Sequence, residues 1–91
     1  MKAPDEFCKF CGYFFQDIFD IYATPEDAIM FARSQITTAE RDAVRKFLDQ
    51  ILSSSLTGRQ LQELWFHSGS EVWFPDADKN RKFLELIRRL I

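Results

Sequence analysis

Apolar residues recur every three to five positions between Thr38 and Ser53, a spacing that lines one face of an α-helix. Thr37 and Glu40 have the spacing of a capping box, in which each side chain accepts a hydrogen bond from the other residue's backbone N–H. The serines from Ser53 to Ser55 are expected to end the helix, because hydroxyl side chains compete for backbone hydrogen bonds. The predicted apolar face comprises Ala39, Ala43, Val44, Phe47, Leu48, Ile51 and Leu52.

Three further helix starts have similar capping chemistry. Thr24 precedes Pro25, whose fixed φ suits the first helical position. Thr57 is followed three residues later by Gln60, which is a second capping box, and Asp76 can begin a final helix. The apolar positions expected to face inward are Ala28, Ile29 and Ala32 in the first, Leu61, Leu64 and Trp65 in the second, and Phe83, Leu84, Ile87, Leu90 and Ile91 in the third.

One glycine and two stretches of the chain need separate interpretations. Gly69 is placed to stop the helix that begins after Thr57, in the left-handed conformation. The segment 71–75 is short, aromatic and ended by proline, so it is either an extended connector or an isolated edge strand. Residues 7–19 keep a helical rhythm around Gly12, which either breaks that helix or allows another helix to approach closely. The whole pattern predicts an all-α fold in a single domain, residues 1–91, as a small bundle of about five helices.

Composition narrows the class of protein. The chain has 91 residues, of which 46% are hydrophobic and 29% charged, so it can bury one core without disulfide or metal support. Charged residues interrupt every apolar stretch before it reaches the ~20 residues of a membrane span. The first residues lack the apolar region of a signal peptide, so we expect a cytoplasmic protein with no membrane partner.

Charge is distributed unevenly. The net charge is −2, which disfavours a general nucleic-acid binder. Residues 1–27 contain two basic and six acidic residues, a balance of −4, whereas residues 28–91 have a balance of +2. The acidic first third would suit a basic partner, although a solvated acidic face is an equally simple interpretation.

No pattern of catalytic or metal-binding residues stands out. Cys8 and Cys11 would need two further zinc ligands, and His67 is the only histidine, so we expect two small apolar thiols rather than a metal or redox site. No serine or cysteine signature accompanies His67, and no glycine-rich phosphate loop is present. We therefore expect no metal, no cofactor and no enzymatic activity. Basic residues near Trp73 and in the last helix could bind single-stranded nucleic acid, but a solvated helix face explains them as well.

Residues 12–19 resemble the signature "GYF-x-QD" of the small immunity proteins of contact-dependent growth inhibition, the CdiI type. The order of predicted elements after it is also similar to that family. The resemblance implies a cytoplasmic antitoxin that binds the C-terminal toxin domain of a CdiA-type effector and neutralises it. Such toxins are often nucleases with basic clefts. Within the motif, Gly12, Phe14 and Gln16 are interpreted as architectural.

The acidic first third fits this role, because carboxylates can fill a basic cleft and accelerate association. Aromatic residues outside the predicted apolar faces could anchor such an interface or form a second layer of core. The candidate toxin-binding residues are Asp5, Glu6, Tyr13, Asp17, Asp20, Tyr22, Glu26, Asp27 and Trp73. Asp17 has a competing structural role as a helix cap. The alternative function is a helical interaction or regulatory domain, or a homodimer, with no toxin partner.

Overall fold

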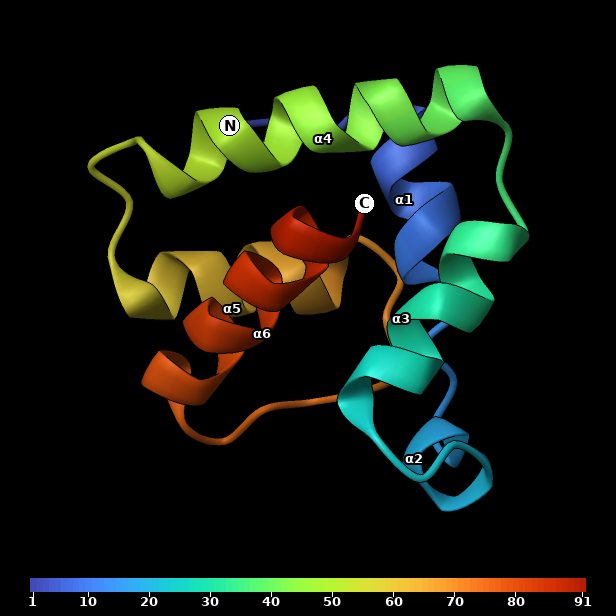
Figure 1. Cartoon of the computed structure of the whole chain (residues 1–91). Coiled ribbons are helices and arrows are strands. Elements are labelled where there is room, and N and C mark those ends of the chain that lie inside the picture. The colour runs from blue at the N-terminus through green and yellow to red at the C-terminus, as the bar shows by residue number, and fades with distance from the viewer.

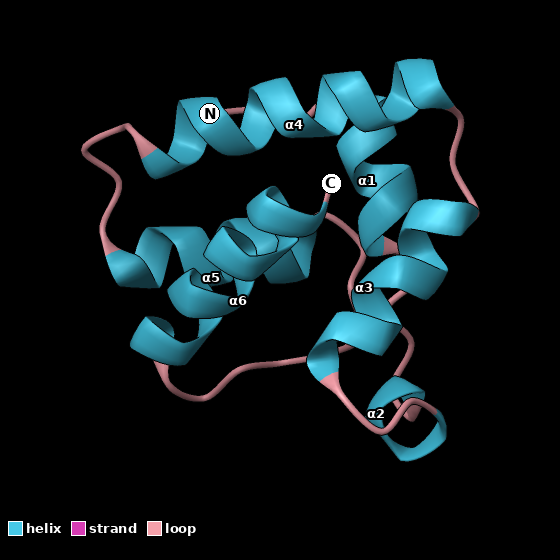
Figure 2. Cartoon of the chain, viewed as in Figure 1, coloured by secondary structure: helices cyan, strands magenta, loops and turns pink.

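The computed structural model describes all residues, 1–91, and contains six α-helices and no strand (Figure 1, Figure 2). The predicted all-α fold is confirmed, with one helix more than the five expected. In chain order the helices are α1 (Asp5–Cys11), α2 (Ile18–Ile21), α3 (Pro25–Ser34), α4 (Thr38–Leu52), α5 (Gly58–His67) and α6 (Ala77–Leu90).

The predicted capping residues begin the four longest helices. The hydroxyl oxygens of Thr24, Thr37 and Thr57 each accept a hydrogen bond from a first-turn N–H, and both predicted capping boxes are complete. The Asp76 carboxylate accepts from two backbone N–H groups of α6. Gly69, just after α5, has a φ of +111°, a conformation that L side chains rarely adopt. The segment 71–75 is an extended connector and not a strand.

The N-terminal helical rhythm is broken at Gly12. This residue has an αR conformation directly after α1, and its backbone N–H closes the last turn. A Cβ at Gly12 would approach only backbone oxygens of α1 itself, the nearest at 3.4 Å. The glycine therefore ends a helix and does not serve a close approach by another helix. After six non-helical residues, 12–17, the chain resumes as α2, which has a single turn.

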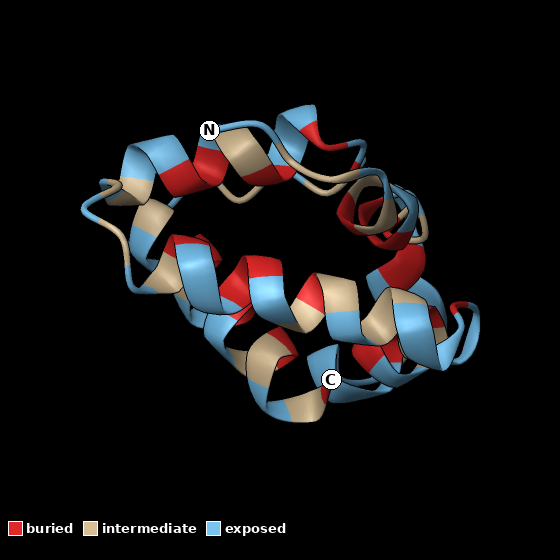
Figure 3. Cartoon of the chain, turned by 90° about the horizontal axis from the view of Figure 1, so that it is seen from above, coloured by how far each residue is buried: buried red, intermediate tan, exposed pale blue.

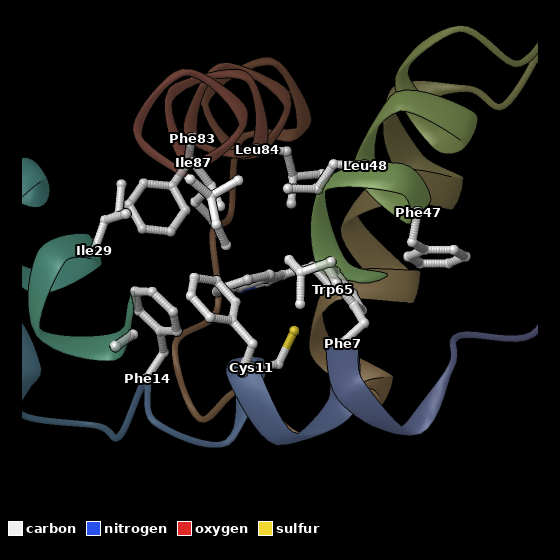
Figure 4. Close-up of a cluster of buried hydrophobic side chains, with 14 of the residues drawn as sticks. Phe7, Cys11, Phe14, Ile29, Phe47, Leu48, Trp65, Phe83, Leu84 and Ile87 are labelled. Carbon is white, nitrogen blue, oxygen red and sulfur yellow. The ribbon is translucent and has the colours of Figure 1, made fainter. Parts of the chain in front are cut away.

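Helix α6 lies at the centre of the packing, in contact with α3, α4 and α5, while α1 packs on α4 and α2 on α3 (Figure 1). Buried and exposed stripes alternate along the helices (Figure 3). The core holds an aromatic cluster in which the Phe14 ring lies 5.1 Å from Trp65 and 5.6 Å from Phe83, centroid to centroid (Figure 4). Residues from the first and last thirds of the chain therefore share one core.

Phe10, one of the aromatic residues outside the predicted apolar faces, is fully buried and packs edge-on against Phe14, so it belongs to the core and not to an exposed interface. Two expectations about burial are wrong. Ala39 is exposed although it continues the apolar pattern of α4. Cys11 is buried as expected, but Cys8 is partly exposed; both are free thiols. Burial raises the pKa of the Cys11 thiol well above its ordinary value.

Candidate protein-binding surface

The six predicted acidic residues fall into two groups. Asp5 and Glu6 lie in the first turn of α1, which packs on α4. Of the other four, two lie just before and within α2 and two lie in the first turn of α3; these helices are in mutual contact at the edge of the molecule (Figure 1). These four, Asp17, Asp20, Glu26 and Asp27, are all exposed. The fold thus gathers four of the six carboxylates on one corner.

Local packing fixes this corner in place. Ile18 is fully buried and anchors α2 in the core. The Phe19 ring contacts Phe83 of α6 edge-on at 5.9 Å, and the Tyr22 ring stacks on Phe31 of α3 at 5.2 Å. Thr24 then caps α3 and directs its acidic first turn outward. The single turn of α2 is held by aromatic packing, since the Asp17 side chain makes no capping hydrogen bond.

Three apolar side chains of this corner are exposed, and the sequence analysis missed them as candidates. Ile21 is 65% exposed, Met30 43% and Phe19 37%. The helical rhythm of residues 7–19 includes Phe19, but a helix of one turn can bury only one side, and Ile18 takes that side. The spacing of Glu26 and Met30, four residues apart, could have placed Met30 on the acidic face of its helix. We call Asp17, Phe19, Asp20, Ile21, Glu26, Asp27 and Met30 together the α2–α3 surface.

The carboxylates of the first third make no ion pair. Every carboxylate in an ion pair belongs to residue 40 or later. The five pairs are Lys9–Glu40, Asp42–Arg45, Asp49–Arg88, Arg59–Glu63 and Arg81–Glu85. No basic residue occurs among the 23 residues between Lys9 and Arg33. The charge of the α2–α3 surface is therefore not neutralised by any ion pair within the chain.

The predicted aromatic anchors are divided between two places. Tyr13 and Tyr22 are partly buried, and both contact the Phe31 ring of α3, which brings them next to the α2–α3 surface. Trp73 is 49% exposed and instead packs edge-on against Phe66 of α5, at 5.2 Å. The structure therefore groups the two tyrosines with the four carboxylates and leaves Trp73 in a separate aromatic pair.

The motif residues also differ in their surroundings. Phe14 is buried in the core, whereas Gly12 and Gln16 are exposed. The segment that holds them is tied to the connector after α5. The backbone N–H of Glu71 donates to the Phe14 carbonyl at 2.9 Å, and the Gln16 N–H donates to the Glu71 carboxylate at 3.3 Å. This link holds the loop that leads into α2.

Other surface features offer less to a ligand. Two open grooves, of about 320 and 360 Å³, lie beside α5 near His67 and beside α4 near Lys46, and neither includes the α2–α3 surface. No group of three or more His, Cys, Asp or Glu residues is placed to hold a metal ion. Arg81 and Arg88 of α6 are engaged in ion pairs. None of the six helices has the length and apolar character needed to cross a membrane.

Comparison with models of protein families, with curated proteins and with solved structures finds no match to this chain.

Proposed function

We propose that this protein is an immunity protein that binds the C-terminal toxin domain of a contact-dependent growth inhibition effector and blocks it, with no reaction of its own. The observation that carries the proposal is the set of six carboxylates in the first 27 residues, none of which forms an ion pair within the chain. Unpaired surface charge of one sign accelerates association with an oppositely charged partner and favours the correct partner over others.

A toxin domain that acts on nucleic acid fits this charge. Such a domain must present basic side chains to phosphates, so its cleft is positively charged. An acidic protein surface can occupy that cleft in place of the nucleic acid. The signature-like segment 12–19 leads directly into α2, so the residues that suggested the family also position the acidic corner.

The test uses the C-terminal domain encoded by the gene immediately upstream in the source genome. We would purify that domain and titrate it with this protein at low and moderate salt. We expect a dissociation constant on the order of nanomolar that weakens as salt rises, because screening shortens the range of the electrostatic attraction. Cells that express the domain should survive when they also express this protein. Absence of both binding and rescue would refute the proposed function.

A regulatory or homodimeric helical domain is the second candidate. It is favoured by the exposed apolar side chains, Ile21 and Trp73 above all, which a dimer could bury. Sedimentation velocity of the isolated protein separates the two proposals. A hydrophobic dimer would sediment as a dimer at low and at high salt, because salt screening affects apolar contacts little. The immunity proposal does not require the isolated protein to self-associate.

A further inference from the structure

We infer that the α2–α3 surface is the docking site, and that its occupant is a protein surface with an apolar centre and a basic rim on the toxin domain. This inference deepens the proposed function and rests on it. It narrows the nine residues predicted from the sequence to one corner of the fold and adds three residues, Phe19, Ile21 and Met30.

The apolar part of the surface points to a macromolecular partner. Ile21 is 65% exposed on a single-turn helix, and no neighbouring element covers its side chain. Met30, on α3, and Phe19 add further uncovered apolar area. Protein interfaces bury apolar anchors of this kind at their centre, where a few residues supply most of the affinity. A small cation or anion would make no use of them.

The charge around these side chains identifies the chemistry of the occupant. Asp17, Asp20, Glu26 and Asp27 are exposed and form no ion pair. A nucleic acid or an anionic membrane would be repelled by this negative surface. A second copy joined through the same surface by a two-fold axis would place four carboxylates against four others, so charge disfavours that dimer. A basic protein surface is complementary to it.

The two parts of the surface should act on different steps of binding. Exposed carboxylates mainly accelerate the encounter, and their effect decreases with salt. A buried apolar anchor mainly slows dissociation, and salt affects it little. Asp17 and Asp20 are therefore expected to control the association rate, and Ile21 the dissociation rate.

Two pairs of matched variants test this division against the toxin domain encoded upstream. Asp17→Asn with Asp20→Asn should slow association about ten-fold at low salt, and much less at high salt. Its control, Asp42→Asn with Asp78→Asn, removes the same charge from exposed positions of α4 and α6 and should change the rate less than about two-fold. Ile21→Ser should weaken binding about ten-fold through faster dissociation. Its control, Phe66→Ser, changes an exposed side chain of α5 and should weaken binding less than about two-fold.

Amide hydrogen exchange of the wild-type protein locates the contact independently of any variant. We expect residues 17–31 to gain protection when the toxin domain is added. If the wild-type protein binds but protection appears elsewhere and the variants match their controls, the docking site is refuted while the proposed function stands. If the wild-type protein does not bind, both fall together. Self-association that already protects residues 17–31 in the isolated protein would replace the toxin domain with a second copy as the occupant.

Discussion

Helices α4, α5 and α6 all begin at a side chain that accepts hydrogen bonds from the first turn, whereas among α1, α2 and α3 only α3 does. The ion pairs are divided in the same way between the first three helices and the last three. Four of the five ion pairs lie within residues 38–90, and the fifth joins Lys9 of α1 to Glu40 of α4. In the later region, α4–α6, many polar side chains therefore stabilise the helices through capping hydrogen bonds or ion pairs. In the first region, α1–α3, most polar side chains form neither.

The first region is held in place by its apolar side chains. Phe7, Phe10, Phe14 and Ile18 are fully buried, although they lie in or between helices of only seven and four residues. Isolated helices this short are not stable in water, so tertiary packing must hold them. The comparison teaches that the six carboxylates of the first third remain unpaired because apolar packing, and not ion pairing by these groups, holds this region.

The largest expected effect comes from removing an apolar side chain that attaches the first region to the core. Phe14→Ala should lower the free energy of unfolding by about 3–5 kcal/mol, because it leaves a cavity between Phe10, Trp65 and Phe83. Urea denaturation followed by circular dichroism measures the change. The control Phe66→Ala removes an exposed ring of the later region and should cost less than about 1 kcal/mol. Equal costs would mean that Phe14 does not join the two regions.

A smaller effect compares the helix starts of the two regions. Thr37→Ala should cost about 1 kcal/mol, because it removes a capping-box acceptor from α4. Asp17→Ala, at the equivalent position of α2, should change the free energy of unfolding by less than about 0.5 kcal/mol, since its side chain makes no capping bond. Both costs come from urea denaturation. If Asp17→Ala proves as costly as Thr37→Ala, Asp17 caps α2 in solution, and a structural role would account for its place in the motif.

Much of the fold could be predicted from the sequence because helix starts are local. Thr37 and Glu40, or Thr57 and Gln60, are three residues apart, so their pairing depends on nothing distant. Burial depends on which helices pack together, and that is decided by contacts far apart in the sequence. The pattern therefore leaves open whether Phe10 belongs to the core, and its burial in the same cluster as Trp65 and Phe83 depends on tertiary packing.

The candidate site could be predicted only in part, for the same reason. The acidic residues are visible in the sequence, but their pairing is not. Lys9 finds its carboxylate 31 residues away, at Glu40, and leaves nearby Asp5 and Glu6 unpaired. Similarly, the exposure of Ile21 depends on how a single helical turn sits on α3. Only the fold shows which carboxylates remain unpaired and which apolar side chains remain exposed.

The smallest expected effect concerns the one ion pair that crosses between the regions, Lys9–Glu40, with an N–O distance of 2.9 Å. The hydrogen bond from the Thr37 N–H, and then the one from Lys9, lower the pKa of Glu40 below its ordinary value of 4.5. A carboxyl group with a lowered folded pKa contributes stability above its unfolded pKa and loses it as pH falls through the folded pKa. Glu40→Gln can keep the capping-box acceptor but not the charge. We therefore expect wild-type protein to exceed the variant in stability near neutral pH by a small, salt-sensitive margin that disappears below the folded pKa, as measured by thermal unfolding across pH. A margin that persisted in acid would show that Glu40 acts through its shape and hydrogen bonds alone, and that α1 is held on α4 by its apolar contacts without help from charge.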